Sequence, residues 1–291
     1  MKKIKFNFNI LILVILIILI IIFLFFYFLN IHSHYIMKDR NGNNFKYNKE
    51  LFIDNKKNKE LKIIVIQDGA YNKFPEYSEY STKINELYCK KWKYDYKFIK
   101  HDVKKMPPYW LKVNDLNEYI NKNYDYVVFL DLDACFYDFD VSLENLITEV
   151  NNVGHTDFDI YIGKDSAFNS VANTGAFIFK NSNFGKMFAQ IWLSTCINSQ
   201  DKITNQGINW DYDTKYKVWN CDKCIWAGLS YEQGVFNYLY KVSNKNISVL
   251  DKSFLSNSNV AKKSFIFHGM GKTDKNRFNI FKQIYKKIKN I

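Results

Sequence analysis

The feature that most constrains the fold is a short apolar run that ends in two carboxylates. The run is Tyr126–Leu130, and Asp131 and Asp133 follow it with one residue between them. A β-branched and aromatic run of this length predicts a buried strand. Because residues i and i+2 of an extended chain point to the same side, the two carboxylates can direct their oxygens at one point. Such a pair of oxygen ligands suits Mg²⁺ or Mn²⁺ held against a diphosphate.

Patterns typical of strands and helices alternate along the rest of the chain. The predicted strands cover residues 61–67, 94–99, 125–130, 158–162, 175–179 and 264–267, and the predicted helices cover 78–92, 109–119, 184–196 and 232–240. This order predicts an α/β fold with a mainly parallel sheet covered by helices. Ligands bind beyond the carboxyl ends of such strands, where we expect Asp131, Asp133 and His268.

Two other interpretations of the acidic pair compete with metal binding. Asp residues at strand ends are common in turns and helix caps. The run also resembles the start of a haloacid-dehalogenase-type phosphatase, in which the first Asp is a nucleophile and the second a general acid. Against the phosphatase, Cys135 stands where that family usually has Thr or Val, and no Gly-Asp-x-x-x-Asp motif follows.

The first 60 residues differ in character from the rest. Residues 10–29 are apolar and long enough to span a bilayer, and no small-residue cleavage site follows them. We therefore expect a cytosolic tail at 1–9, an uncleaved transmembrane signal anchor at 10–29, a stem at 30–60 and one folded domain at 61–291. Three lysines in the tail favour a cytosolic N-terminus, and the polar composition of the stem is typical of a flexible segment.

Charge and cysteine content narrow the choice of partners. The net charge of +12 comes from 41 Lys+Arg and 29 Asp+Glu spread along the chain, which favours anionic substrates. No nucleic-acid-binding module accompanies this charge, so we expect no nucleic-acid partner. Of five cysteines, Cys221 and Cys224 form a lone CxxC pair. A zinc site needs two more ligands at a suitable spacing, which we do not find, so a local disulfide or buried thiols are expected.

Six short motifs follow one another in order between residues 61 and 272. They are N-E-L-Y-C at 85–89 with Y-D-Y at 94–96, W-L-K at 110–112, F-L-D-L-D-A at 129–134, N-T-G-A-F-I-F-K-N-S at 173–182, E-Q at 232–233 and H-G-M-G-K at 268–272. In this order they make the chain resemble glycosyltransferase family 34. The chain departs from that family at Lys180, Gly269 and Lys272, and its segment 199–229 does not match. Families 8 and 77 therefore stay open as alternatives.

The resemblance implies a GT-A fold, which is a Rossmann-like α/β fold with a mainly parallel sheet, and a DxD motif that binds Mn²⁺ or Mg²⁺. Asp131, Asp133 and His268 would be the metal ligands, and Asp131 would also contact the nucleotide sugar. Neutral imidazole suits Mn²⁺ better than Mg²⁺. The metal would act as a Lewis acid on the departing nucleoside diphosphate.

The same resemblance implies further site residues. Glu232, Gln233 and Asn173 would be catalytic, with the acid–amide pair stabilising an oxocarbenium-like state or orienting the donor sugar. Lys112, Gly175 and Lys272 would also bind the nucleotide sugar. From their position at the end of the first predicted strand, rather than from the resemblance, we expect Gln67, Asp68 and Tyr71 to lie at the nucleotide base. Each of these residues also has a structural interpretation. A helix N-terminus favours Glu, a turn favours Asn and Gly, and most lysines are solvated.

The sequence therefore predicts a metal-dependent retaining glycosyltransferase with its catalytic domain at 61–291. It would move a hexose or pentose from UDP-Gal, UDP-Xyl, UDP-Glc or GDP-Man to a hydroxyl of a glycan or glycoprotein. We expect a single-pass type II membrane protein facing the Golgi or ER lumen, or host secretory membranes if viral, and homo- or hetero-oligomers are left open. The alternative is a catalytically degenerate, membrane-anchored domain that acts as a carbohydrate-binding or assembly subunit.

Overall fold

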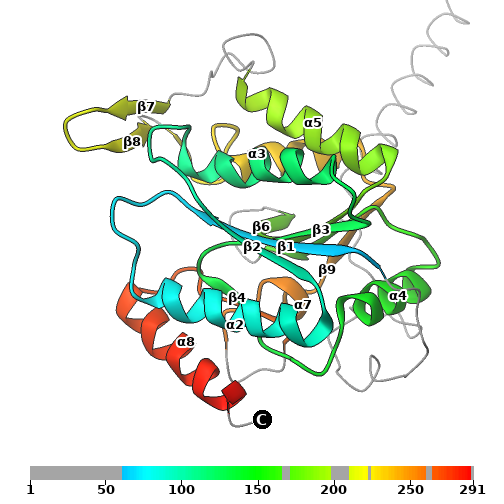
Figure 1. The fold of residues 1–291 in the computed structure, drawn as a ribbon. Coiled ribbons are helices and arrows are strands. Elements are labelled where there is room, and N and C mark those ends of the chain that lie inside the picture. Colours follow the sequence, from blue (N-terminus) through cyan, green and yellow to red (C-terminus); the bar gives the residue numbers. More distant parts are fainter. Residues whose placement is uncertain (1–60, 166–170, 198–209, 222–223, 260–263, 290–291) are drawn as a thin grey trace, which may run out of the picture. The chain divides into compact units, whose positions relative to one another are not determined.

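Figure 1 shows the computed structural model of the chain, which describes residues 61–165, 171–197, 210–221, 224–259 and 264–289. All of them belong to the larger of the chain's two units, Ile36–Ile291. The expected cytosolic tail, signal anchor and stem lie outside the described residues. Among the helices that are described, none is long and apolar enough to cross a bilayer.

Six strands form one central sheet in the order β2-β1-β3-β6-β5-β9. They are β1 (Ile63–Gly69), β2 (Asp95–Lys100), β3 (Tyr126–Leu130), β5 (Ile160–Lys164), β6 (Ala172–Lys180) and β9 (Ile247–Leu250). β1 pairs in parallel with β2 and β3, and β5 pairs in parallel with β9, whereas β6 runs antiparallel to β3 and β5. Five strands of this sheet therefore share one direction, which confirms the predicted mainly parallel sheet.

Helices cover both faces of this sheet (Figure 1). On one face lie α3 (Pro108–Ile120), α5 (Asn183–Ile197) and α6 (Glu232–Val242), and on the other lie α2 (Tyr77–Trp92), α4 (Leu143–Gly154) and α7 (Lys252–Leu255). A last helix, α8 (Asp274–Lys289), packs against α2. Two helix layers therefore enclose the sheet, as an α/β fold requires.

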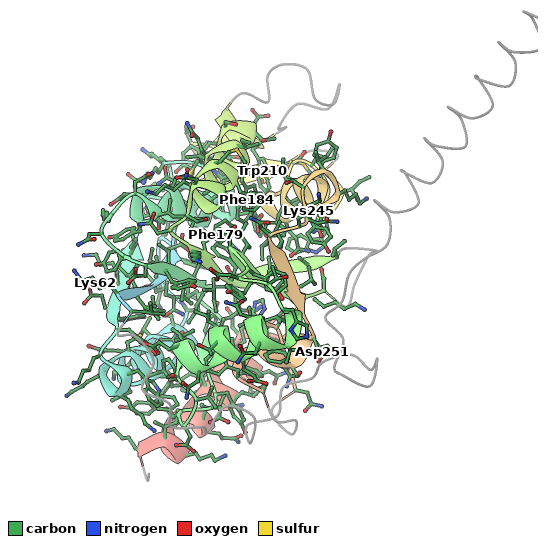
Figure 2. All side chains as sticks on the ribbon, turned by 90° about the vertical axis from the view of Figure 1, so that its right-hand side faces the viewer. Lys62, Phe179, Phe184, Trp210, Lys245 and Asp251 are labelled. Carbon is green, nitrogen blue, oxygen red and sulfur yellow. A yellow bond between two sulfur atoms is a disulfide. The ribbon has the colours of Figure 1, made fainter. Side chains whose placement is uncertain are left out.

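Alternate residues of the central strands point to opposite faces and fill two separate cores. Ile63 and Val65 of β1 pack with α2 and α4, whereas Ile64 and Ile66 pack with α3 and α6. Side chains occupy the space on both sides of the sheet, where Phe179 of β6 is fully buried (Figure 2). Each buried aliphatic side chain contributes about 1.5–3 kcal/mol, so burial on both faces explains why these strands are uninterrupted apolar runs.

Two small sheets lie outside the central one. β4 (Ala134–Phe136) pairs antiparallel with β10 (Ile266–His268), and β7 (Trp210–Asp213) pairs with β8 (Val218–Cys221) as a hairpin. The sequence places His268 at the end of a central strand, and this prediction is wrong. His268 lies opposite Ala134, because the chain turns after β3 and continues as β4, which pairs with β10 instead of joining the main sheet.

Candidate active site

The candidate site lies where β3 ends and β6 begins. Because β6 runs antiparallel to β3, Ala176 lies opposite Leu130, and the residues before Ala176 reach the same end of the sheet as Asp131. The amide of Asp131 donates to the carbonyl of Gly175 at 2.7 Å. This register brings residues 173–175 beside the acidic pair.

Gln67 supports the loop that carries the two carboxylates. Its side chain is fully buried, and Nε2 donates to the carbonyl of Asp131 at 3.0 Å and to that of Ala134 at 3.3 Å. Its Oε1 accepts from the Tyr96 hydroxyl at 2.7 Å and from the Asn85 amide at 3.1 Å. Both polar atoms of this side chain are therefore engaged within the protein, under the loop.

Asp131, Asp133 and His268 converge from the turn after β3 and from β10. One ligand atom of each lies within 4.8 Å of the others. Nε2 of His268 is 3.2 Å from Oδ1 of Asp133 and 3.7 Å from Oδ2 of Asp131. The Nδ1 atom of His268 is buried and has no hydrogen-bond partner among the described residues. Two carboxylates and one imidazole form a ligand set that suits Mn²⁺, so the residues fit the predicted metal.

Gly175 lets the imidazole of His268 approach the sheet closely. A Cβ at this position would overlap the ring, at 2.7 Å from Nε2 and 2.8 Å from Nδ1. Asn173 braces the same part of β6, since its Oδ1 accepts from the amide of Gly175 at 3.0 Å. Its Nδ2 lies 3.6 Å from the sulfur of Met270. The first residues of β6 are therefore fitted around the histidine.

The charges around Asp133 keep it ionised. Nη2 of Arg277, on α8, lies 2.8 Å from Oδ2 of Asp133. Burial would raise the pKa of Asp133, but His268 and Arg277 outweigh it and lower the pKa to about 2. Burial would likewise lower the pKa of His268, but Asp133 and Asp131 outweigh it and raise the pKa. The proton on His268 therefore balances part of the negative charge of Asp131 and Asp133.

Lys112 and Glu232 form a buried ion pair beside Asp131. Nζ of Lys112 lies 2.5 Å from Oδ1 of Asp131 and 3.4 Å from Oε1 of Glu232. Burial would lower the pKa of Lys112, but Asp131 and Glu232 outweigh it and raise the pKa, so the amine stays charged. Burial raises the pKa of Glu232. Its Oε1 accepts from the Thr174 hydroxyl at 2.9 Å, and its Oε2 is buried without a hydrogen-bond partner among the described residues.

Gln233 connects the start of α6 to β6. Its Nε2 donates to Oδ2 of Asp165 at 2.8 Å, and its Oε1 accepts from the amide of Thr174 at 3.3 Å. Glu232 is the acidic residue in the first turn of the helix, where the positive end of the helix dipole favours it. Gln233 is therefore placed to hold Glu232 and Thr174 in position.

These elements enclose a cavity of about 520 Å³, which we call the charged cavity. The predicted site residues that line it are Asp68, Tyr71, Lys112, Asp131, Asp133, Asn173, Glu232 and His268. The predicted residues that are not part of its lining are Gln67, Gln233, Gly175 and Lys272. The first three of these support lining residues from behind, and Lys272 follows the turn after β10.

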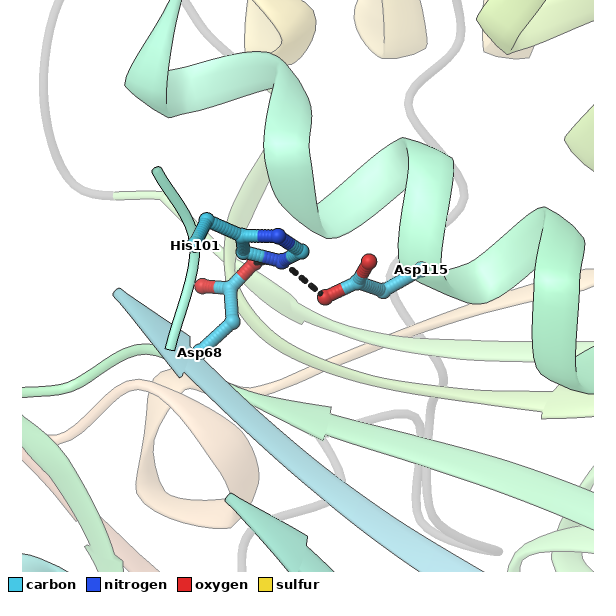
Figure 3. A group of neighbouring side chains, drawn as sticks. All are labelled: Asp68, His101 and Asp115. Carbon is cyan, nitrogen blue, oxygen red and sulfur yellow. Dashed lines mark hydrogen bonds and ion pairs between the residues drawn. The ribbon is translucent and has the colours of Figure 1, made fainter. Parts of the chain in front are cut away.

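A second group of buried ionisable side chains adjoins the charged cavity (Figure 3). Nε2 of His101, just after β2, lies 2.7 Å from Oδ2 of Asp115 on α3 and 3.9 Å from Oδ2 of Asp68 on β1. Burial, followed by the charge of Asp115, raises the pKa of Asp68. A carboxyl group with a raised pKa can donate a hydrogen bond as well as accept one. Sequence reasoning misses His101 and Asp115, because only the packing of α3 on β1 brings them to Asp68.

Arg277 is the second omission of the sequence reasoning. It is the only arginine in residues 61–291, in a chain whose 41 basic residues include just one other arginine, Arg40. Besides pairing with Asp133, its Nε donates to the carbonyl of Gly269 at 3.1 Å. A planar guanidinium can hold a carboxylate and a carbonyl at once, which a lysine ammonium does with less fixed geometry. The rarity of arginine in this lysine-rich chain is the signal that marks the residue.

Comparison with known proteins identifies the fold. No protein-family model matches the sequence, and no curated protein does. Among solved structures, a glycosyltransferase involved in the glycosylation of the major capsid of PBCV-1 matches with a TM-score of 0.54 and 14% identity, over 76% of this chain and 99% of that chain. At this identity the likeness shows a shared fold, so the predicted GT-A fold is confirmed, whereas membership of family 34 stays a prediction.

Two further structures match less well. The galactosyltransferase LgtC, solved with donor and acceptor sugar analogs, has a TM-score of 0.45 and 11% identity over 77% of this chain and 95% of that chain. The glycosyltransferase GlyE of Streptococcus pneumoniae TIGR4 has a TM-score of 0.43 and 12% identity over 78% of this chain and 63% of that chain. At these TM-scores we draw no argument from either.

Proposed function

We propose that this protein is a metal-dependent glycosyltransferase that moves a sugar from a nucleotide sugar to a glycan hydroxyl with retention of configuration. The observation that carries the proposal is the convergence of Asp131, Asp133 and His268 on the wall of one cavity. The fold shared with a glycosyltransferase supports it. The motif resemblance to family 34 is the basis for retention and for UDP-Gal, UDP-Xyl, UDP-Glc or GDP-Man as the donor.

Asp131, Asp133 and His268 would hold the Mn²⁺ or Mg²⁺. When bound, the ion would supply Lewis-acid stabilisation of the negative charge on the leaving diphosphate. The protein's own contribution is to fix the ligands: Arg277 holds Asp133 at 2.8 Å, and the missing side chain at Gly175 leaves room for the imidazole. Ligands held in this way reach the reactive geometry without further reorganisation.

Lys112 is our candidate for a second positive charge at the leaving group. Its Nζ is held by Asp131 at 2.5 Å and lies 3.3 Å from the carbonyl of Thr174, so the amine has little freedom to move. A fixed cation in a site that excludes water stabilises developing negative charge more than a mobile one in solvent. Lys272 takes no such position in the cavity lining, and we assign it no role at the leaving group.

Glu232 is our candidate for the group that faces the donor sugar. One oxygen is engaged by Thr174 and Lys112, which leaves Oε2 for a ligand. A carboxylate there would stabilise positive charge that develops on the sugar ring as the bond to the diphosphate breaks. We propose Gln233 and Gln67 as positioning residues rather than ligand contacts, because their amides are engaged with Asp165 and with the loop after β3.

The nucleotide base would lie at the β1 end of the charged cavity. Tyr71, which is 44% exposed, could stack on the base, and Asp68 lies beside it with a buried oxygen that has no hydrogen-bond partner among the described residues. Asn173 would approach the donor sugar from the start of β6. These assignments keep the base at the end of β1 and the sugar near Glu232.

We further propose that the chain acts as a type II single-pass membrane protein facing the secretory lumen, with a glycan or glycoprotein as acceptor. The basis is the apolar segment 10–29 and the tail before it. The non-catalytic alternative, a carbohydrate-binding or assembly subunit, does not require a metal site. The assembled ligand set, together with Lys112 and Glu232, favours the enzyme.

The test is a donor-hydrolysis screen on the purified protein with Mn²⁺ and UDP-Gal, UDP-Xyl, UDP-Glc, UDP-GlcNAc or GDP-Man. We expect release of nucleoside diphosphate from one donor, its loss in EDTA, and a fall of roughly 10³-fold in Asp133→Ala. Asp211→Ala, which removes an exposed carboxylate from the β7–β8 hairpin, is the matched control and is expected to keep full activity. No release from any donor, together with no nucleotide binding by calorimetry, would favour the subunit instead.

A further inference from the structure

A second cavity, of about 480 Å³, adjoins the charged cavity. Ala70, Tyr71, Pro108 and Tyr109 line both cavities, so the two share a wall at the rims of β1 and α3. A molecule seated in the second cavity therefore has one end next to the residues that line the first. The volume falls in the range of about 300–1,000 Å³ that is usual for sites of small molecules.

The outer wall of this second cavity comes from the β7–β8 hairpin. Trp210 and Trp219 line it, and both indoles are anchored: Nε1 of Trp210 donates to the carbonyl of Ser230 at 2.8 Å, and Nε1 of Trp219 donates to that of Val103 at 2.7 Å. The N–H groups are thus satisfied by the protein. A ligand can therefore contact the apolar surfaces of the two rings, which are held in a fixed orientation.

Further rings hold the hairpin against the rest of the site. The Tyr109 ring lies 5.7 Å from that of Trp210 and 5.0 Å from that of Tyr231, and Trp210 lies 5.3 Å from Tyr231. A disulfide joins Cys221, at the end of β8, to Cys224. The aromatic wall is therefore tied to the start of α3 and to the residue before α6. We call the space that it encloses the aromatic cavity.

The two cavities differ in charge. The lining of the charged cavity includes four carboxylates, a histidine, a lysine and an arginine, whereas Lys217 is the only charged residue among those described as lining the aromatic cavity. Apart from hydroxyl groups and main-chain atoms, the other polar groups that line it are the side-chain amides of Asn72 and Asn220. Flat apolar rings with a few amide and hydroxyl groups at their edges match a neutral sugar, which has apolar C–H faces and a rim of hydroxyls.

We propose that the aromatic cavity binds the saccharide acceptor and presents one of its hydroxyls to the charged cavity past Tyr109. This inference rests on the proposed function. In the reaction, the bond between C1 of the donor sugar and the diphosphate oxygen breaks, and a bond between C1 and the acceptor oxygen forms. The nucleoside diphosphate departs with the electron pair and takes up the hydroxyl proton.

The first test measures saccharide binding without any reaction. Saturation-transfer-difference NMR is recorded on the full chain with methyl glycosides of glucose, galactose, mannose, xylose and N-acetylglucosamine, and with lactose and cellobiose. We expect saturation transfer to at least one of them, reduced about tenfold or more in Trp219→Ala, which removes a stacking surface. Saturation transfer to none of these sugars, or an unchanged signal in Trp219→Ala, overturns the proposal.

Two further variants test whether loss of folding explains the loss of saccharide binding in Trp219→Ala. Asn220 is exposed and its side chain makes no hydrogen bond to another described residue, so Asn220→Ala is expected to weaken binding about threefold to tenfold through a lost hydrogen bond to the ligand alone. Tyr216→Ala is the matched control, because Tyr216 is 65% exposed on the same hairpin and does not line the aromatic cavity. Equal loss of binding in Tyr216→Ala would show that the hairpin, rather than the cavity, is responsible.

The second test separates this inference from the proposed function. With the donor found in the hydrolysis screen, Trp219→Ala and Asn220→Ala are expected to raise the KM for the saccharide acceptor and to leave donor hydrolysis within about twofold. Loss of hydrolysis in both variants would contradict the division between the cavities. If the wild type hydrolyses no donor but binds a saccharide through Trp219, the proposed transfer fails while the saccharide site stands.

Discussion

The charged cavity and the aromatic cavity share a wall but are built in different ways. The first is formed at the ends of central strands, and buried hydrogen bonds such as those of Gln67 hold its loops. The second takes its outer wall from the β7–β8 hairpin, which pairs with no other described strand. The groups that need exact placement for charge therefore lie on the central strands and on the elements packed around them, while the hairpin can change its side chains without disturbing them. The comparison predicts that substitutions in the two regions have separable effects.

Among substitutions outside the metal ligands themselves, the largest effect is expected from Gly175→Ala. The new Cβ would overlap the imidazole of His268 and displace it from Asp133. A displacement of about 1 Å at a reacting centre costs about 100-fold in rate, and overpacking costs about 1–3 kcal/mol of stability. Donor hydrolysis measures the change in rate, and thermal unfolding measures the change in stability. Gly271→Ala is the control for thermal unfolding only, because Gly271 lines the charged cavity; its Cβ would meet open space, although its φ of 70° adds strain of about 1–2 kcal/mol. Full Mn²⁺ affinity in Gly175→Ala would remove His268 from the ligand set.

Arg277→Lys is expected to lower kcat/KM about tenfold. A lysine keeps the charge but cannot hold Asp133 and the carbonyl of Gly269 together, so the carboxylate loses its fixed orientation. The pKa of Asp133, now about 2, is expected to rise, which moves the acid limb of the pH–rate profile upward. Lys282→Ala on the same helix is the control and is expected to change neither. An unchanged profile in Arg277→Lys would mean that His268 alone sets the pKa.

The pH dependence of metal binding is expected to follow His268. Its folded-state pKa is raised, so in the metal-free protein its proton stabilises the fold at low pH, and this contribution is lost as pH rises through the raised pKa. Metal binding has the opposite sign, because the imidazole must lose its proton to become a ligand. Calorimetry with Mn²⁺ is expected to show affinity that rises about tenfold per pH unit below that pKa. His268→Gln is expected to abolish the slope, and a slope that survives would point to another group.

The smallest effect is expected from the double variant Cys221→Ser, Cys224→Ser. Without the disulfide the end of β8 is less restrained, and the acceptor KM is expected to rise about twofold to threefold while donor hydrolysis stays constant. Steady-state kinetics with acceptor measure its KM, and kinetics without acceptor measure donor hydrolysis. Cys196→Ser, which replaces a half-buried thiol on α5 outside the disulfide, serves as the control. A fall in donor hydrolysis would show that the hairpin also supports the charged cavity.

The sequence predicts the parts of the fold and site that local patterns encode. The apolar run before Asp131 and the alternation of strands and helices are local, and β1, β2, β3, β5 and β6 lie within a few residues of their predicted ranges. Helix α3 is predicted at 109–119 and observed at Pro108–Ile120, since a proline pair marks its start. The approach of Lys112 to Asp131 follows from the packing of this helix on β1 and β3.

The parts that sequence reasoning misses depend on contacts between distant segments. The resemblance predicts that His268 joins Asp133, but the pairing of β10 with β4 that brings them together is not predicted. Arg277 reaches Asp133 because α8 packs against α2. The strand β9 has four residues, too few for a period to be counted. Helix α8 does carry apolar residues at helical spacing, at Phe278, Phe281, Ile284 and Ile288, which sequence reasoning overlooks. The hairpin belongs to the segment 199–229 that matches no motif of the family.

Lys112 and Arg277 would keep the folded protein stable without the proposed metal ion. Each already neutralises one of the two carboxylates in the metal-free state, Asp131 and Asp133 respectively. A chelator is therefore expected to stop turnover while leaving the melting temperature nearly unchanged, unlike small zinc domains that unfold when their metal is removed. Such a chain would tolerate repeated loss and reloading of metal. The local concentration of Mn²⁺ would then set the turnover rate without changing the lifetime of the folded protein.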